Sequence, residues 1–549
     1  MSHISKKEPI NWHTWENSTL EKAKNEQKSI FLFIHSPSSK WSRKMQEASF
    51  DDETIIELLN ERFIPIKVNK DERPDIEKYY QKVYKLMNRE ATSSPLSLFL
   101  TANLEPFYAG AYIPHEDIDE QLSLESLLRV VSKKYITDYD TLSQKGQEVL
   151  SFVDPQENSI QATKLHLNIM NTIKEHTLNL LDEKFGGFTK APKFPNASTL
   201  ELLFDVYQLD KDEKILNAIT LTLNNMMNHD FYESENGGFY QYAQDESWDN
   251  PYKVKTTYDN AQLIKLYLRA YIITRNEAYK EVAFNSIEFM LKARKNAKLF
   301  ALEDEAIVTS WNALMVQALF LASNIDEKYQ KNAFETLESL LSELYPSGTL
   351  YHSKRVNEKP STQAFLEDYA TLAETLILAY QQSLDESFLI MATQFSNLLI
   401  EQYYEQARWV YAKGAFKMRE VIYDTTIPSS IASALSLLLS ISSLVDNNYK
   451  KFVFKTLELH SYNLMRQPLS SPKLSQMVIR YLKDDLIVQA KESLLKEHLS
   501  KRVNSSYPYL WIKAVNEEEI TLWNSHSMLT KEPTFEKAMN AIGDYCEKI

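Results

Sequence analysis

The sequence predicts a multidomain protein in which an N-terminal α/β domain precedes a large all-α ring of helical hairpins, an (α/α)6 barrel. Three observations support this prediction. Up to about residue 115, short apolar runs typical of strands alternate with helix-like patterns. From about residue 120, the strand pattern mostly disappears and long amphipathic helices dominate. Within these helices a motif recurs every 52 to 63 residues, as it does in repeated helical hairpins.

The N-terminal part has a β-α-β-α-β-β order. Residues 29–35 form an apolar run typical of a buried strand, and residues 63–69 alternate like a second strand. Helix patterns cover residues 41–46, 52–60 and 75–88. Two further strands, at 95–101 and 106–112, lie close enough in sequence to form a hairpin. This order predicts an α/β or α+β domain.

The helical repeat is clearest at two places. The pentapeptide DNAQL begins at Asp259 and DYATL begins at Asp368, and an Ala-Tyr pair follows each of them at the same offset. A looser copy surrounds Trp311, and weaker copies begin near residues 196 and 430. One repeat holds two helices and two loops, so five or six copies favour a closed ring over an open solenoid.

These patterns divide the chain into four parts. We predict a first domain, a helical linker, the ring, and a mixed C-terminal segment that closes or decorates the ring, at residues 1–118, 119–159, 160–481 and 482–549. In the last segment, residues 510–514 and 520–523 have the pattern of short strands.

Composition excludes several classes of protein. The net charge of −14 argues against a nucleic-acid or anionic-membrane partner. The most apolar stretch, at about residues 432–445, is shorter than the roughly 20 residues that span a bilayer. The one cysteine, Cys546, excludes an intrachain disulfide and a cysteine zinc cluster. Because the start of the chain also lacks an apolar signal core, we expect a cytoplasmic protein.

Several short motifs together resemble those of a known family. In the first domain they are SSKWSRKM around Trp41, Ser49-Phe50-Asp51-Asp52, the charged run 66–75 and the run 95–101. In the ring they include Gly186-Gly187-Phe188, Ala191-Pro192-Lys193-Phe194-Pro195, Gly237-Gly238-Phe239, Tyr258-Asp259-Asn260-Ala261, Thr309-Ser310-Trp311-Asn312 and Pro428-Ser429. Their order and spacing resemble the spermatogenesis-associated protein 20 family. The resemblance implies a thioredoxin-like domain joined to a barrel similar to six-hairpin glycosidases and sugar epimerases, without a well-defined activity.

The resemblance also implies a lost redox site. The family usually carries Cys-His-Trp-Cys where this chain has Ser39-Lys40-Trp41-Ser42. Disulfide exchange requires a thiolate, which a serine hydroxyl cannot replace. We therefore expect no thiol–disulfide exchange there. Pro95 aligns with the proline beside the redox pair of thioredoxin folds, so Ser39, Ser42 and Pro95 form either a surviving substrate-binding edge or a relic that serves the fold.

Polar residues at the starts of the repeated helices are candidates for catalysis. Inner-helix starts gather at one end of a ring, where a carboxylate meets the positive end of the helix dipole. Asp259 and Asp368 could then act as acid and base in glycoside chemistry, and His352 could transfer a proton. The alternative is that each aspartate only caps its own helix.

Further candidates for a ligand pocket lie near the same loops. They are Tyr242, Asp245, Trp248, Tyr258, Trp311, Asn312, Arg355, Glu367, Tyr369 and Asp424. Aromatic faces stack on sugar rings and an arginine binds anionic groups, so these residue types fit a carbohydrate. Packing between the inner helices is the alternative explanation of the aromatic residues.

Three classes of function stay open at this stage. The chain is a sugar isomerase or glycosidase-like enzyme, a protein that binds a sugar-like molecule without catalysis, or a scaffold whose first domain docks a protein partner. The resemblance implies a His and a Glu before the Tyr-Asp motif, whereas this chain has Tyr252-Lys-Val-Lys255 there. This difference argues against full catalysis. We expect no cofactor and no metal.

Overall fold

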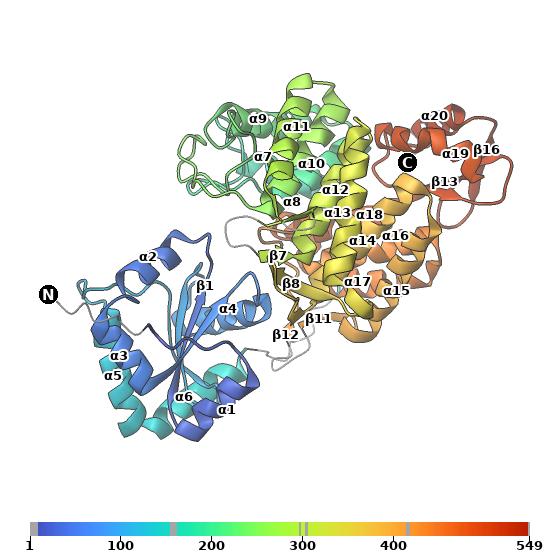
Figure 1. Cartoon of the computed structure of the whole chain (residues 1–549). Coiled ribbons are helices and arrows are strands. Elements are labelled where there is room, and N and C mark those ends of the chain that lie inside the picture. The colour runs from blue at the N-terminus through green and yellow to red at the C-terminus, as the bar shows by residue number, and fades with distance from the viewer. Residues whose placement is uncertain (1–8, 154–161, 296–297, 302–305, 413–417, 547–549) are drawn as a thin grey trace. The chain divides into compact units, whose positions relative to one another are not determined.

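The computed structural model describes residues 9–153, 162–295, 298–301, 306–412 and 418–546. The chain divides into two compact units near residue 158 (Figure 1). None of the helices in these described residues is both long and apolar enough to cross a bilayer.

The first unit contains a four-stranded sheet in the order β2-β1-β3-β4. Strand β1 (Ser29–His35) pairs in parallel with β2 (Phe63–Asn69) and antiparallel with β3 (Leu96–Leu100). Strand β4 (Pro106–Gly110) completes the hairpin with β3. The predicted β-α-β-α-β-β order is present, and the unit has the thioredoxin-like fold.

Helices cover both faces of this sheet. They are α1 (Asn17–Glu26), α2 (Lys40–Ala48), α3 (Glu53–Arg62), α4 (Pro74–Asn88), α5 (Leu124–Thr137) and α6 (Tyr139–Ser151). The side chains of β1 alternate between two cores: Ile30 and Leu32 pack with α1 and α4, whereas Phe31 and Phe33 pack with α2, α3 and α5. A strand that is buried on both faces has to be apolar throughout, which explains the run at 29–35.

Helices α5 and α6 lie in the stretch 119–159 that the sequence predicts as a linker, and both pack within the first unit. Helix α5 adds Leu124 and Leu128 to the core. Helix α6 is held by Glu105, whose carboxylate accepts hydrogen bonds from Ser143 Oγ at 2.8 Å and Gln147 Nε2 at 2.7 Å. The first unit therefore extends about 35 residues beyond the predicted boundary at residue 118, because α5 and α6 are needed to cover its sheet.

The second unit is a closed ring of helical hairpins. Its inner helices are α8 (Ala197–Asp210), α10 (Thr257–Thr274), α12 (Thr309–Ser323), α14 (Leu366–Ser383), α16 (Ser430–Leu444) and α18 (Pro472–Lys483). Each inner helix contacts the next, and α18 contacts α8, which closes the ring. In Figure 1, α10, α12 and α14 lie side by side, coloured from green to yellow.

A second set of helices packs around the inner ones. These outer helices are α7 (Ile169–Leu180), α9 (Glu213–Asn228), α11 (Glu277–Lys292), α13 (Lys328–Leu344), α15 (Glu386–Tyr403) and α17 (Lys450–Arg466). Alternation of inner and outer helices is the predicted (α/α)6 barrel. Five inner helices begin at residues 197, 257, 309, 366 and 430, within two residues of the predicted starts.

Short strands occupy several connections that lead into the inner helices. They are β5 (Arg294–Lys295) with β6 (Leu299–Phe300), β7 (Ala306–Val308) with β8 (Tyr351–Arg355) and β9 (Thr362–Gln363), and β10 (Tyr404–Glu405) with β11 (Arg408–Ala412) and β12 (Met418–Arg419). Single turns of 3-10 helix lie at η2 (Pro346–Gly348), η3 (Asn447–Tyr449) and η4 (Pro468–Ser470). The sequence analysis did not predict these small sheets.

The C-terminal segment contains a second four-stranded sheet, in the order β14-β13-β15-β16. Its elements are β13 (Leu486–Ala490), α19 (Glu492–Leu495), η5 (Lys496–Asn504), β14 (Leu510–Ala514), β15 (Ile520–Trp523), β16 (Met528–Glu532) and α20 (Phe535–Cys546). Its core is continuous with that of the ring. The Gln381 amide, near the C-terminal end of α14, donates to Ile512 O at 2.7 Å and accepts from Ile512 N at 2.9 Å. The sheet therefore packs against the C-terminal ends of the inner helices.

Candidate functional site

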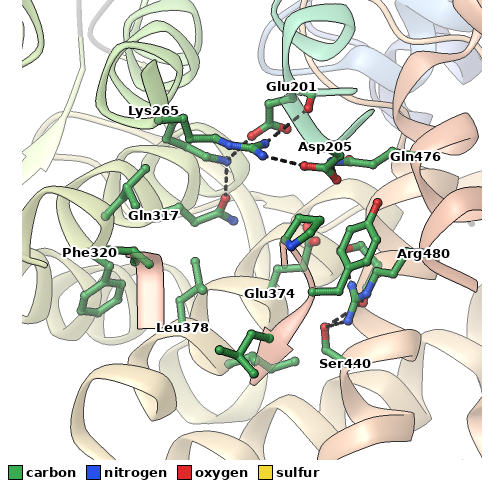
Figure 2. A pocket seen from close by; sticks show the side chains of 18 of the residues that line it. Glu201, Asp205, Lys265, Gln317, Phe320, Glu374, Leu378, Ser440, Gln476 and Arg480 are labelled. Atoms are coloured by element: carbon green, nitrogen blue, oxygen red, sulfur yellow. Dashed lines mark hydrogen bonds and ion pairs between the residues drawn. The ribbon is translucent and has the colours of Figure 1, made fainter. Parts of the chain in front are cut away.

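A cavity of about 300 Å³ lies inside the ring (Figure 2). All six inner helices and residues 502–511 of the C-terminal segment contribute side chains to its lining. On α10 the polar lining residues are Gln262, Lys265 and Arg269, which follow the i, i+3, i+7 spacing of one helix face. The serines of α16 and the polar residues of α18 have the same spacing. The ring therefore presents polar stripes to its interior, although its inner helices are mostly apolar.

Glu201 on α8 lies between two lysines. Its carboxylate is 3.3 Å from Lys265 Nζ of α10 and 3.3 Å from Lys473 Nζ of α18. Burial would raise the pKa of the Glu201 carboxyl, but Lys265, Lys473 and Arg269 outweigh it and hold this pKa well below its usual range. Glu201 is therefore a stable carboxylate that joins three inner helices.

Asp205 forms a second link among the same helices. Its Oδ1 accepts from Arg269 Nη2 at 2.6 Å, and its Oδ2 accepts from Gln476 Nε2 at 2.6 Å. The Oε1 atom of Gln476 is buried and has no hydrogen-bond partner among the described residues. An acceptor of this kind, on a side chain that lines the cavity, is available to a ligand hydroxyl.

Arg480 on α18 is held by an ion pair with Asp485 and by hydrogen bonds to α16. Its guanidinium donates to both carboxylate oxygens of Asp485 at 2.7 Å, and also to Ser440 Oγ at 2.9 Å and Ser436 O at 3.1 Å. Figure 2 shows Arg480 beside Ser440. This bidentate pair fixes the arginine between α16 and α18.

Glu374 on α14 differs from the other carboxyl groups. Within the described residues, no Lys, Arg or His nitrogen lies within 4.0 Å of it. Burial raises the pKa of the Glu374 carboxyl above its usual value, and Lys473, Ser436, Lys265 and Arg480 offset this effect only in part. The surroundings therefore shift the two carboxyl pKa values in opposite directions, upward for Glu374 and downward for Glu201.

None of the residues predicted as catalytic or ligand-binding lines this cavity. They lie at the N-terminal ends of the inner helices or in the loops that precede them. Their role in ligand binding stays a prediction. The hydrogen bonds that they form in the structure are those of helix caps and loop anchors.

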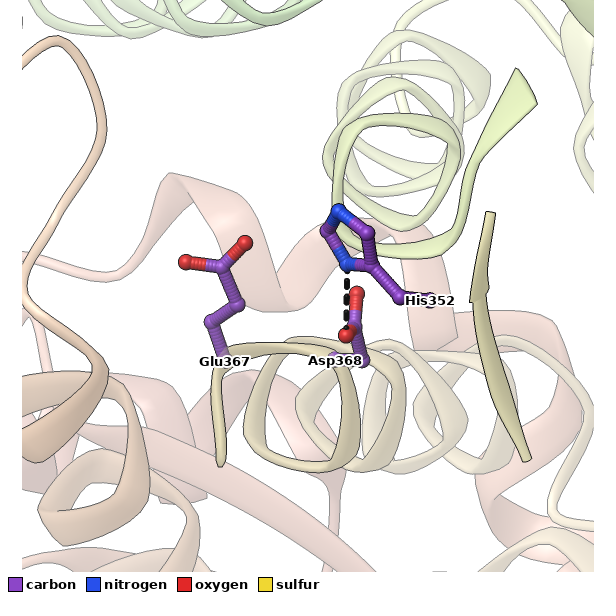
Figure 3. A group of neighbouring side chains, drawn as sticks. All are labelled: His352, Glu367 and Asp368. Atoms are coloured by element: carbon purple, nitrogen blue, oxygen red, sulfur yellow. Dashed lines mark hydrogen bonds and ion pairs between the residues drawn. The ribbon is translucent and has the colours of Figure 1, made fainter. Parts of the chain in front are cut away.

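Asp368 caps α14 and connects it to its neighbours (Figure 3). Its Oδ2 accepts from Phe365 N at 2.9 Å and lies 2.8 Å from His352 Nδ1, while its Oδ1 accepts from Ser310 N at 3.3 Å. Donor atoms of His352, Glu367 and Asp368 lie within 4.8 Å of one another, which is close enough to hold a metal ion. Because the oxygens of buried Asp368 already accept three hydrogen bonds, we interpret the group as a structural link.

The candidates on α10 and α12 have matching roles. Asp259 lies in the first turn of α10, where Thr256 Oγ1 donates to its Oδ2 at 2.6 Å. The Asn312 amide of α12 accepts from Phe300 N at 2.7 Å and donates to Phe300 O at 3.0 Å. The rings of Tyr258 and Trp311 pack together with centroids 4.9 Å apart, so an aromatic pair does lie at the helix starts.

Tyr242, Asp245 and Trp248 lie in the loop before α10. The Trp248 side chain is fully buried, with its Nε1 donating to Phe185 O at 2.9 Å. Tyr242 packs on the Phe194 ring at 5.2 Å, and Asp245 accepts from Ser247 Oγ at 2.9 Å.

The last three candidates lie farther along the chain. Tyr369, the next residue of α14 after Asp368, packs on the Phe395 ring at 5.6 Å, and Arg355 is an exposed residue at the end of β8. Asp424 contacts a helix that lines the cavity, since its Oδ2 accepts from the backbone N of Lys473 at 2.8 Å. Burial raises the pKa of the Asp424 carboxyl to about 6.

In the first unit, the two serines lie at the start of α2. Ser39 is the N-cap residue: its Oγ accepts from Ser42 N at 3.3 Å and donates to Ser94 O at 2.8 Å. The Ser94–Pro95 peptide bond is cis. Ser42 is fully buried. Ser39 and Ser42 therefore lie beside Pro95, which is far from them in sequence.

Comparisons with known proteins identify the relatives of this chain. A protein-family model for a thioredoxin-like DsbH domain, described as a protein of unknown function, DUF255, matches residues 2–154. Human spermatogenesis-associated protein 20 is 30% identical over 310 residues, which cover 54% of this chain and 39% of that protein. The mouse protein is 31% identical over 312 residues. The chain is a relative of spermatogenesis-associated protein 20.

The chain thus matches about two fifths of the length of spermatogenesis-associated protein 20. Among solved structures, an α-1,6-mannanase from Salegentibacter sp. HEL1_6 is 16% identical with a TM-score of 0.44, covering 57% of this chain and 99% of that one. A D-mannose isomerase is 12% identical with a TM-score of 0.46, covering 58% of this chain and 98% of that one.

Sequence analysis missed the cavity residues for an identifiable reason. Each polar stripe consists of two or three residues within a long apolar helix, such as Lys265 and Arg269 within α10. A search for polar residues at i, i+3 or i+4, and i+7 on one face of each inner helix would have found those on α8, α10, α16 and α18.

Proposed function

We propose that the ring binds a small sugar-like molecule in its interior cavity, and that the thioredoxin-like unit performs no thiol–disulfide exchange. The observation that carries the first proposal is the convergence of hydrogen-bonding side chains from all six inner helices on one space of about 300 Å³. Ligand pockets generally measure about 300–1,000 Å³, so this space suits a small ligand.

The lining suits a molecule rich in hydroxyl groups. Gln317, Ser440 and Gln476 offer amide and hydroxyl groups, while Phe320 and Trp511 offer apolar faces. Buried polar groups cost free energy unless they are hydrogen-bonded, and among these three side chains Gln476 has an acceptor without a partner in the described residues. The free acceptor on Gln476 supports this assignment.

A second candidate function, a sugar isomerase or hydrolase, is favoured by the two glutamates. Acid–base chemistry on a sugar needs one group that donates a proton and another that is ionised. Surroundings that push two carboxyl pKa values apart assign these roles, and Glu374 and Glu201 differ in this direction. On this proposal Glu374 transfers the proton, and Glu201, which its ion pairs make a weak base, stays ionised and binds the substrate.

The proposal is tested by a thermal-shift screen of neutral and charged sugars on the full chain. A ligand at about a hundred times its Kd stabilises a protein by roughly 2.7 kcal/mol. For a chain of this length the expected rise in melting temperature is a few degrees. Leu378 lines the cavity, so the Leu378→Trp variant should fill part of it and abolish the shift.

The matched control is Ile390→Trp, because Ile390 is exposed on the outer helix α15. This variant should keep the ligand-induced shift. The double variant Asp259→Asn with Asp368→Asn compares the helix starts with the cavity. If it loses binding while Leu378→Trp retains it, the ligand binds at the helix starts and the cavity proposal is wrong.

A scaffold function is the remaining alternative, and one surface feature favours it. Trp41 is 47% exposed on α2 and packs against Tyr112 with ring centroids 4.8 Å apart. Exposed aromatic residues of this kind often contribute to protein interfaces. If no compound shifts the melting temperature and Trp41→Ala abolishes capture of a stable protein partner, the scaffold function is supported instead.

A further inference from the structure

The lining of the cavity carries more positive than negative charge. The cations are Lys265, Arg269, Lys473, Arg480 and Arg502. The carboxylates paired with them are Glu201, Asp205 and Asp485. Glu201 is shared by two lysines. Five cations thus face three carboxylates that form ion pairs with them.

Glu374 does not remove this imbalance. It forms no ion pair within 4.0 Å with any described residue, and even when it is ionised the five cations face only four carboxylates. Buried charge of one sign is costly unless a counter-charge is present. The excess of positive charge in the interior therefore calls for an anion.

Arg502 is the cation whose environment is least satisfied. Its Nη1 donates to Leu510 O at 3.2 Å, but its buried Nε has no hydrogen-bond partner among the described residues. No carboxylate of the described chain lies within 4.0 Å of this guanidinium. Burial lowers the pKa of Arg502 to about 10, so its charged form lacks compensation.

The segment that carries Arg502 is anchored to the ring. Nη2 of Arg275, the residue that follows α10, donates to Asn504 Oδ1 at 2.9 Å, and Gln208 Nε2 of α8 donates to Ser505 O at 3.4 Å. The Arg502 guanidinium lies 5.7 Å from the centroid of the Trp511 ring. These contacts hold Arg502 at the wall that residues 502–511 contribute to the cavity.

From this geometry we infer that the ligand of the ring is an anionic sugar whose carboxylate or phosphate group is bound by Arg502. The inference rests on the proposed function, because it names the chemical class of the molecule that the cavity takes. A guanidinium binds a carboxylate or a phosphate through two parallel hydrogen bonds. Nε and one Nη form an edge of the guanidinium that can donate both of them. Nε is the atom that lacks a partner here.

The test is isothermal titration of the full chain with four probes: glucose, glucuronate, glucose 6-phosphate and inorganic phosphate. At least one anionic sugar should bind roughly tenfold or more tightly than glucose, since a hydrogen bond to a charged group strengthens binding to about this extent. Glucuronate and glucose 6-phosphate distinguish a carboxylate from a phosphate ligand. Binding should also weaken as ionic strength rises.

The variant Arg502→Gln should lower the affinity for the anionic sugar roughly tenfold or more. Its affinity for glucose should stay within about twofold, because the lost interaction is with the anionic group alone. The matched control is Arg466→Gln, which removes the same charge from an exposed position on the outer helix α17 and should change neither affinity. If Arg502→Gln does not fold, Arg502→Lys keeps the charge but lacks the two parallel donors. It should show a smaller loss of affinity for the anionic sugar.

The outcomes separate the two proposals. If glucose binds as tightly as glucuronate and glucose 6-phosphate, or if Arg502→Gln weakens the binding of all sugars equally, the ligand is not an anionic sugar. The proposal that the ring binds a sugar is then still supported. If inorganic phosphate binds and Arg502→Gln weakens it, but no sugar binds, the proposed function fails and the anion site stands. If none of the three anions binds, the inference is overturned.

Discussion

Asp424 shows how one residue can couple the ring to pH. Its carboxyl accepts hydrogen bonds from Ser429 N and Lys473 N, each at 2.8 Å, and so ties the loop before α16 to the start of α18. Burial raises its pKa from 3.8 to about 6 in the folded chain. Between pH 3.8 and about 6, the folded state therefore keeps a proton on Asp424 that the unfolded state has released.

This difference predicts a decline in stability as pH rises from about 4 to about 6, because the folded state then loses a proton it holds more tightly. Below this window both states are protonated and Asp424 contributes no decline. In the Asp424→Asn variant this part of the pH dependence should be missing. Melting temperatures at pH 4 and pH 6 measure it, and Asp230→Asn, an exposed position, is the control. Equal pH dependence in wild type and Asp424→Asn would contradict the assignment.

Ser39 and Ser42 lead to the prediction that the first unit performs no thiol–disulfide exchange. The wild type should show no insulin reduction above buffer with dithiothreitol, since it has no thiol at the start of α2. The double variant Ser39→Cys with Ser42→Cys should gain measurable turnover, because a helix N-terminus stabilises a thiolate. Ser39→Cys alone is the control, as it cannot form a disulfide within the site. Wild-type turnover that persists in Cys546→Ser would contradict the prediction.

At the scale of elements, the repeated motif places a side chain at the start of α10 and of α12 that forms hydrogen bonds with the loop before the helix. Asn260 accepts from Phe239 N at 2.8 Å and donates to Phe239 O at 3.1 Å, and Asn312 does the same with Phe300 at 2.7 and 3.0 Å. The corresponding position of α14 is Tyr369, so this copy of the motif uses Asp368 and His352 instead. The repeated sequence motif is therefore a loop anchor.

Removal of one anchor should destabilise the ring. Asn312→Ala removes the two hydrogen bonds that this amide forms with the backbone of buried Phe300, at a cost of about 1–3 kcal/mol. The melting temperature should fall by several degrees, whereas Asn217→Ala on the exposed face of α9 should leave it nearly unchanged. Equal melting temperatures for the two variants would show that the amide is not an anchor.

Five inner helices could be predicted from sequence because each begins with a recognisable motif. The sixth, α18, was missed since it begins at Pro472 without that motif. The short strands β7 and β8 were missed because they are three and five residues long, and their pairing depends on residues far apart in the chain. The cavity was missed because Glu201 and Lys473 meet only when α18 closes the ring against α8.

At the scale of the whole molecule, two units contribute differently to function. The thioredoxin-like unit keeps its fold with serines at the start of α2, and the proposed scaffold function would use its exposed Trp41. The ring combines an apolar shell with a charged interior that connects α8, α10 and α18. A charged interior that spans several helices is costly for stability alone, which supports its assignment to a ligand.

The central claim is that the ligand binds inside the ring. The most direct test is a crystal structure of the full chain grown with the tightest-binding sugar of the thermal-shift screen. We predict ligand density in the cavity, within hydrogen-bonding distance of Gln476 and Lys473 and with its anionic group on Arg502. Density at the helix starts beside Asp259 and Asp368, with the cavity occupied by water alone, would contradict the account.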